Sequence, residues 1–165
     1  MTLIAPTADA PAKLYGGEAP AKSSRPKRRR RPPSRGRLLW VDDDANVTAA
    51  MTRRFRRKGY EVVPASDGMQ GYWLAVTRKP DLIITDLRMP RWEGRDLLEC
   101  LLHNSATMGV PLIVVSGYIT PEERRRLERM GVAAAFDKPV EWRTLLTTVR
   151  DLLHNNPAGL HNNPA

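Results

Sequence analysis

The sequence predicts an α/β domain in which a parallel five-stranded sheet is covered by helices on both faces. Two observations carry this prediction: five short apolar runs occur along the chain, and an amphipathic segment of helical length follows each of them. Strands that alternate with helices form parallel sheets of this kind. The expected domain, about residues 37–153, is large enough at about 120 residues to fold without a disulfide or a structural metal.

The five expected strands share short runs of apolar and β-branched residues, as strands buried on both faces do. They are expected at 38–41, 60–65, 82–86, 110–115 and 132–136. The helices between them have apolar residues at helical spacing. They are expected at 45–58, 67–79, about 95–103, 121–130 and about 140–153.

Capping residues mark several of these helix ends. Asp44 is a suitable N-cap for the first helix, and Gly59 ends it. Thr120 is expected to cap the fourth helix, with Pro121 at its first position and a glutamate at its third, and Gly131 stops it.

The net charge of +9 lies almost entirely in an N-terminal tail. Residues 1–37 hold ten of the 27 Lys and Arg residues and two acids, so they carry +8. Residues 1–36 are rich in Pro, Ala, Ser and Arg without an apolar period, and we expect them to be disordered. Residues 154–165 contain His-Asn-Asn-Pro-Ala twice and are expected to form a flexible tail.

The sequence also favours a cytoplasmic location. No run of about 18 apolar residues could span a membrane, and the first 20 residues lack the apolar stretch of a secretory signal. The single cysteine, Cys100, cannot form an internal disulfide or a Cys-based zinc site. Its apolar helical surroundings indicate a packed small hydrophobic residue.

Polar residues end four of the five expected strands. Asp42 and Asp43 follow the first, Asp86 ends the third, Ser116 follows the fourth, and Lys138 follows the fifth. In open parallel sheets, ligands bind beyond the carboxyl ends of the strands, so these side chains are expected to form one site.

This set of residues suits phosphoryl transfer. Crowded carboxylates repel one another, and Mg²⁺ relieves the repulsion while it accepts phosphate oxygens as further ligands. A lysine and a hydroxyl can bind the remaining phosphoryl oxygens. A carboxylate is a competent nucleophile that yields an aspartyl-phosphate.

With these residues in place, the chain resembles the response-regulator receiver family over about residues 37–153. The resemblance rests on five matches in order: Val41-Asp42-Asp43-Asp44, Asp86-Leu87-Arg88-Met89-Pro90, Gly94, Ser116-Gly117 and Lys138-Pro139. Each match alone is weak, and together at this spacing they are specific. The resemblance implies a doubly wound, flavodoxin-like (βα)5 fold with strand order 2-1-3-4-5.

The resemblance also implies the role of each residue. Asp86 is expected to be the phosphoacceptor, with Lys138 and Ser116 binding the phosphoryl group. Asp43, Asp86, Asp42 through water, and the backbone carbonyl of Arg88 are expected to hold Mg²⁺. The donor would be a phosphohistidine on a histidine kinase or phosphotransfer protein, so the chain is expected to be a phosphoacceptor signalling protein and not an enzyme with an external substrate.

One position departs from the family pattern. The family usually has an aromatic residue three positions before the lysine, and its rotamer changes with activation. Here that position is Ala135, and Phe136 is expected to point to the opposite face of its strand. The aromatic switch is therefore not expected in this chain.

Two alternative functions would depend on other features of the sequence. A haloacid-dehalogenase-like phosphatase would need a second aspartate two residues after the nucleophile, where this chain has Arg88. A nucleic-acid-associated regulator would act through the basic arm, by non-specific contacts of residues 22–37. Because only 12 residues follow the last expected helix, the main expectation is a stand-alone receiver that docks to an unidentified downstream protein or passes its phosphate onward.

The first helix is itself strongly basic. Its C-terminal part carries Arg53, Arg54, Arg56, Arg57 and Lys58. A solvated helix face is the default interpretation, and a docking face for an acidic partner is the alternative.

Overall fold

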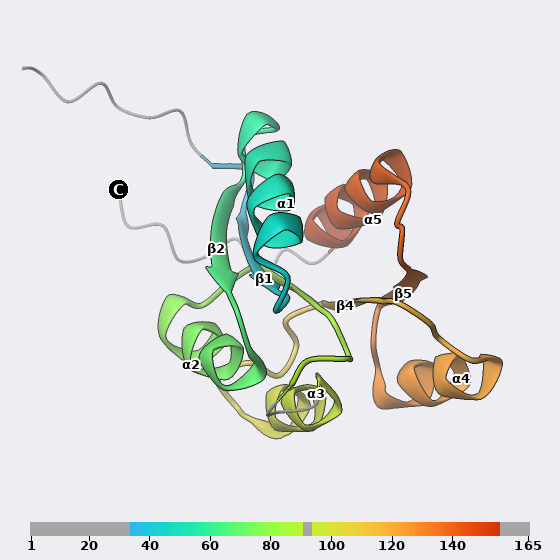
Figure 1. Cartoon of the computed structure of the whole chain (residues 1–165). Helices are drawn as coiled ribbons and strands as arrows, with labels where there is room; N and C mark the ends of the chain where they lie inside the picture. The colour runs from blue at the N-terminus through green and yellow to red at the C-terminus, as the bar shows by residue number, and fades with distance from the viewer. Residues whose placement is uncertain (1–33, 91–93, 156–165) are drawn as a thin grey trace, which may run out of the picture. The chain divides into compact units, whose positions relative to one another are not determined.

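The computed structural model describes residues 34–90 and 94–155. Strands and helices alternate through this part of the chain (Figure 1). In chain order they are β1 (Arg37–Val41), α1 (Ala45–Arg57), β2 (Glu61–Ala65), α2 (Gly68–Arg78), β3 (Leu82–Thr85), α3 (Gly94–His103), β4 (Leu112–Ser116), α4 (Pro121–Met130), β5 (Ala134–Asp137) and α5 (Trp142–Asn155).

The five strands form one parallel sheet in the order β2-β1-β3-β4-β5. Strand β1 lies in the interior and pairs with both β2 and β3, and β4 joins β3 to the edge strand β5. The chain therefore reverses its direction of travel across the sheet between β2 and β3. The predicted fold class and strand order are confirmed.

Alternate residues of each strand pack on opposite faces of the sheet. In β1, Leu38 and Trp40 belong to one buried cluster and Leu39 and Val41 to the other. The first cluster lies beneath α1 and α5, and the second lies beneath α2 and α3, which Figure 1 shows on opposite sides of the sheet. This alternation follows from the two-residue period of a strand. It leaves the strand ends as the place where polar side chains gather.

The helix caps agree with the sequence prediction. The Asp44 carboxylate accepts hydrogen bonds from the backbone N–H groups of Asn46 and Val47, and the Thr120 hydroxyl accepts one from Glu123. Gly131 ends α4 with a positive φ of 90°, a conformation that glycine adopts without steric cost.

Four predicted boundaries are shifted by two residues: the starts of β4, β5 and α5, and the end of α5. Strand β4 begins at Leu112 and not at 110, and β5 spans Ala134–Asp137 and not 132–136. Helix α5 begins at Trp142 and not at about 140, because the Glu141 carboxylate accepts hydrogen bonds from the N–H groups of Arg143 and Thr144 and so caps the helix there.

No helix within the described ranges is long and apolar enough to cross a membrane. The predicted tails at 1–36 and 154–165 fall almost wholly outside the described residues, so the limits 37–153 stay a prediction.

Candidate phosphoacceptor site

Backbone hydrogen bonds extend the strand pairing by one residue beyond several strand ends. The N–H of Asp86 donates to the carbonyl of Val41 at 2.9 Å, and the N–H of Lys138 donates to the carbonyl of Ser116 at 2.7 Å. The N–H of Asp42 donates to Ala65 at 3.1 Å. These bonds place the candidate site residues at one edge of the sheet, the position that the sequence predicts for them.

Lys138 connects two of the aspartates. Its Nζ donates to Asp86 Oδ2 at 2.7 Å and to Asp42 Oδ2 at 2.8 Å. The side chains of Asp42 and Asp86 are only 2% and 7% exposed, while that of Lys138 is 25% exposed. The ammonium therefore reaches from the rim of the site to two buried carboxylates that are far apart in the sequence.

Asp43 completes a cluster of three carboxylates. One oxygen each from Asp42, Asp43 and Asp86 lies within 4.8 Å of the others. Asp42 and Asp86 are buried, and Asp43 is exposed. Oxygen ligands this close together, from hard carboxylate groups, match the donor set that Mg²⁺ takes in proteins. The cluster therefore fits a divalent cation.

Ser116 presents a buried hydroxyl to the same edge. The residue has no exposed surface, and among the described residues nothing forms a hydrogen bond with its Oγ. A buried hydroxyl without a partner is costly, so most such groups in native proteins are paired. The unpaired Oγ at the end of β4 is a donor that is available to a bound oxyanion.

Two groups of the site have raised pKa values, which favours the neutral form of Asp42 and the charged form of Lys138. Burial raises the pKa of the Asp42 carboxyl, and the hydrogen bond from Lys138 offsets only part of that rise. Burial by itself would lower the pKa of Lys138, but hydrogen bonds to Asp42 and Asp86 outweigh it and raise the pKa. Lys138 is therefore held as a cation, whereas at Asp42 desolvation outweighs the hydrogen bond from the lysine.

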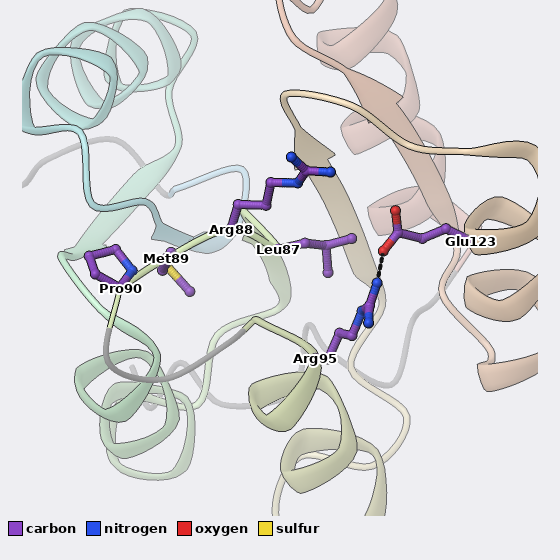
Figure 2. Close-up of a pocket in the computed structure, with 6 residues that line it drawn as sticks. All are labelled: Leu87, Arg88, Met89, Pro90, Arg95 and Glu123. Carbon is purple, nitrogen blue, oxygen red and sulfur yellow. Dashed lines mark hydrogen bonds and ion pairs between the residues drawn. The ribbon is translucent and has the colours of Figure 1, made fainter.

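Asp86 is oriented by the loop that follows it. Its Oδ1 accepts a hydrogen bond from the N–H of Arg88 at 2.9 Å, so its two oxygens have different partners. The side chain of Arg88 is exposed. The same loop lines a pocket of about 450 Å³, whose lining residues are drawn in Figure 2. The lining residues are Leu87, Arg88, Met89, Pro90, Arg95 and Glu123.

An ion pair at this pocket was not foreseen from the sequence. Arg95 at the start of α3 pairs with Glu123 in the first turn of α4, as the dashed line in Figure 2 marks. The two residues are 28 positions apart, and no local pattern links them. Tyr118, in the loop after β4, is 59% exposed.

Ala135 occupies the β5 position at which the family usually has an aromatic residue. Ala135 packs with the cluster beneath α2 and α3, and Phe136 packs with the opposite cluster, which confirms the predicted facing. Arg124 of α4 donates to the carbonyl of Ala135 at 2.6 Å and to Asp137 Oδ2 at 3.0 Å. Polar contacts, and not an aromatic ring, therefore connect α4 to β5 here.

Comparison with known proteins decides the family. The family model described as the response regulator receiver domain matches residues 38–150, which is most of the chain. The chain belongs to this family. All five strand-end groups lie inside the matched region.

Curated relatives of this receiver domain include a transcriptional regulatory protein. The transcriptional regulatory protein CusR of Escherichia coli K12 is 33% identical over 122 residues, covering 74% of this chain and 53% of CusR. Protein PilH of Pseudomonas aeruginosa is 30% identical over 117 residues, covering 71% of this chain and 97% of PilH. The chain thus spans about half of CusR but nearly the whole of PilH.

Solved receiver structures share the fold. A CheY-like receiver domain protein from Methanospirillum hungatei superposes with a TM-score of 0.69 at 29% identity, covering 74% of this chain and 96% of that one. The chemotaxis protein CheY4 of Vibrio cholerae gives 0.66 at 26% identity, with coverage of 70% and 97%. The receiver domain of this chain is therefore a two-component signalling domain of the CheY type.

Proposed function

We propose that this receiver domain accepts a phosphoryl group on Asp86 from a phosphohistidine of a histidine kinase or phosphotransfer protein. One observation carries the proposal: the Asp86 carboxylate bonds to a lysine ammonium and clusters with two further carboxylates. They lie at the sheet edge where β4 ends in Ser116, whose hydroxyl has no hydrogen-bond partner among the described residues. These are the nucleophile, the cation, the metal ligands and the donor that phosphoryl transfer requires.

In the proposed step, a carboxylate oxygen of Asp86 attacks phosphorus. The new O–P bond forms while the P–N bond of the phosphohistidine breaks, and the electron pair returns to the imidazole ring. The transition state is loose, so catalysis rests on positioning and on neutralising charge. Lys138 balances the charge of the phosphoryl oxygens, and Ser116 Oγ donates a hydrogen bond to one of them.

Asp43, Asp42, Asp86 and the backbone carbonyl of Arg88 would hold Mg²⁺. When bound, Mg²⁺ neutralises the repulsion between the carboxylates and the incoming phosphoryl group. The protein orients Asp86 through the hydrogen bond from the Arg88 N–H, and it keeps the three carboxylates close enough to bind one ion. The phosphorylated domain would then signal by docking to another protein or by passing its phosphate onward.

Phosphate incorporation tests this function. Incubation of the full chain with a small phosphodonor and Mg²⁺ should add one acid-labile phosphate per chain, measured by intact mass and by lability. Excess chelator should lower the incorporation at least about tenfold, because the acidic cluster would repel the donor. Equal incorporation with and without Mg²⁺ would contradict the assignment of the acidic cluster.

Replacing Ser116 with alanine should separate function from stability. Because Ser116 Oγ has no hydrogen-bond partner in the described part of the chain, the melting temperature should stay the same or rise. The phosphorylation rate should fall about 10-fold to 100-fold, since a hydrogen bond to a charged group contributes about 1.5–3 kcal/mol. Stopped-flow or quenched kinetics with a small phosphodonor would measure the rate.

Thr52→Val is the matched control for Ser116→Ala. Thr52 also has a buried hydroxyl that finds no hydrogen bond within the described part of the chain, but it lies on α1 away from the site. Its loss should leave the phosphorylation rate unchanged. A slower rate in both variants would assign the Ser116 effect to packing and not to the phosphoryl group.

A further inference from the structure

The loop from β4 to α4 starts directly after Ser116 and has few contacts at its beginning. Gly117 and Tyr118 are exposed, and no backbone–backbone hydrogen bond joins either of them to another described residue. A Cβ atom at Gly117 would meet no atom of the described chain within 4 Å. Packing therefore does not fix the path of the chain where it leaves Ser116.

The end of β4 is paired on one side only. The pairing of β3 with β4 ends at Thr85 and Val114, whereas that of β4 with β5 continues to Ser116 and Asp137. The Lys138 N–H then adds one more bond on the β5 side, to the Ser116 carbonyl at 2.7 Å. The strand end that carries the Ser116 hydroxyl is therefore held from β5, while its side toward β3 has no strand partner.

The Asp137 side chain connects the loop to β5 a second time. Its Oδ1 accepts a hydrogen bond from the backbone N–H of Ile119 at 2.8 Å, and the Ile119 side chain is buried. Together with the bond from Lys138 to Ser116, this contact closes a ring around the two exposed loop residues. The loop is thus fixed to β5 at both of its ends, and one of the two connections depends on a side chain.

Arg124, near the start of α4, orients the Asp137 carboxylate. Its guanidinium donates to Asp137 Oδ2 at 3.0 Å and to the carbonyl of Ala135 at 2.6 Å. A planar guanidinium that binds two acceptors has little rotational freedom left. Because both side chains of this ion pair are more than a third exposed, the pair adds little to stability. Its main effect is on the geometry of the loop.

The geometry of the loop matters because the Ser116 hydroxyl must be aimed. Hydrogen bonds weaken steeply when the donor is misaligned, and a small displacement of a group that contacts the reacting atoms lowers the rate strongly. Ser116 Oγ is buried and has no hydrogen-bond partner among the described residues that could orient it. Its direction therefore depends on the backbone at the end of β4.

We propose that Asp137 is a positioning residue for phosphoryl transfer. By binding the Ile119 N–H, it holds the β4–α4 loop so that Ser116 Oγ points toward the phosphoryl group on Asp86. Both oxygens of Asp137 have partners in the loop and on α4, so it acts through Ser116 and not by contact with the phosphoryl group. The inference rests on the function proposed above, since Ser116 has this task only if Asp86 is phosphorylated.

The first test compares phosphorylation rates of the full chain with a small phosphodonor and Mg²⁺. Asp137→Ala should react about threefold to tenfold more slowly than the unmodified chain, the change expected when one orienting hydrogen bond is lost. Asp137→Asn keeps an oxygen that can accept from the Ile119 N–H, so it should retain at least about half of the rate. A rate of Asp137→Asn as low as that of Asp137→Ala would overturn the role of this hydrogen bond.

A double-mutant cycle with Ser116→Ala tests whether Asp137 acts through Ser116. Once the hydroxyl is absent, there is nothing left to aim, so adding Asp137→Ala should slow Ser116→Ala by less than about twofold. A general loss of packing would instead slow both backgrounds by the same factor. Equal factors in the two backgrounds would therefore overturn the proposal.

Glu99→Ala is the matched control for Asp137→Ala. Glu99 on α3 pairs with Arg126 of α4 at 3.7 Å, and its side chain is 55% exposed, against 50% for Asp137. Each variant thus removes one exposed acid that pairs with an arginine of α4, but Glu99 does not contact the loop. Glu99→Ala should be phosphorylated at the rate of the unmodified chain, and a loss equal to that of Asp137→Ala would assign the effect to the charge or position of α4.

Amide hydrogen exchange at Ile119, followed by NMR, measures the contact without any phosphorylation. Exchange should be at least about tenfold faster in Asp137→Ala than in the unmodified chain and nearly unchanged in Glu99→Ala. Unchanged protection in Asp137→Ala would overturn the proposal.

The rates also separate the two proposals. If the unmodified chain takes up no phosphate, the proposed function fails, and the positioning role fails with it. If the unmodified chain is phosphorylated and Asp137→Ala reacts equally fast, only the positioning role is overturned.

Discussion

Asp86→Asn should abolish phosphorylation, lowering incorporation from a small phosphodonor by at least about a hundredfold. The amide that replaces the carboxylate is a poor nucleophile at phosphorus, so no acylphosphate can form. The fold should persist, because the amide oxygen can still accept the hydrogen bond from the Arg88 N–H. Intact-mass measurement after incubation with donor and Mg²⁺ gives the incorporation directly.

Asp81→Asn provides a matched control at the other end of the same strand. Asp81 precedes β3, and its carboxylate accepts a hydrogen bond from the N–H of Arg37 at 2.6 Å. This variant also removes one partly buried carboxylate, but it should be phosphorylated at the rate of the unmodified chain. Equal incorporation in D86N and the unmodified chain would move the acceptor to another carboxylate of the cluster.

Phe55→Ala should give the largest loss of stability, about 3–5 kcal/mol in the free energy of unfolding. Phe55 is fully buried, and its ring contacts three others: Trp142 at 4.8 Å, Tyr60 at 5.9 Å and Trp40 at 6.2 Å between centroids. Its removal leaves a cavity among aromatic rings that cannot easily close. Urea unfolding followed by tryptophan fluorescence would measure the change in midpoint.

Trp73→Ala is the corresponding surface control. Trp73 lies on α2 and is 62% exposed, so its loss should change the free energy of unfolding by less than about 0.5 kcal/mol. A loss below about 1 kcal/mol in Phe55→Ala would mean that the aromatic cluster does not anchor α1 and α5 to the sheet.

Much of the site could be predicted from the sequence, because its residues occupy strand ends. The run Leu38 to Val41 indicates a buried strand, and the acids that follow must then lie at the sheet edge. The same reasoning brings Asp86, Ser116 and Lys138 to that edge. Helix caps at Asp44 and Thr120 were predictable because capping depends on neighbouring residues only.

Long-range pairing could not be predicted in the same way. The bond between Lys138 and Asp42 joins residues 96 positions apart, and it depends on the side-chain rotamer as well as on the topology. The unpaired state of Ser116 Oγ is a property of its whole surroundings. The first residue of β4 was misplaced because Val110 and Pro111 are apolar but precede the paired segment.

The lysine that bonds to Asp42 and Asp86 also sets the charge of the site. Because the cluster contains three carboxylates and one ammonium, its net charge is −2 when all four groups are ionised. An ion of valence two restores the balance, whereas a monovalent ion leaves the buried carboxylates undercompensated and a trivalent ion overcompensates them. In the proposed function, the position of Lys138 would therefore favour a divalent ion as well as contact the phosphoryl group.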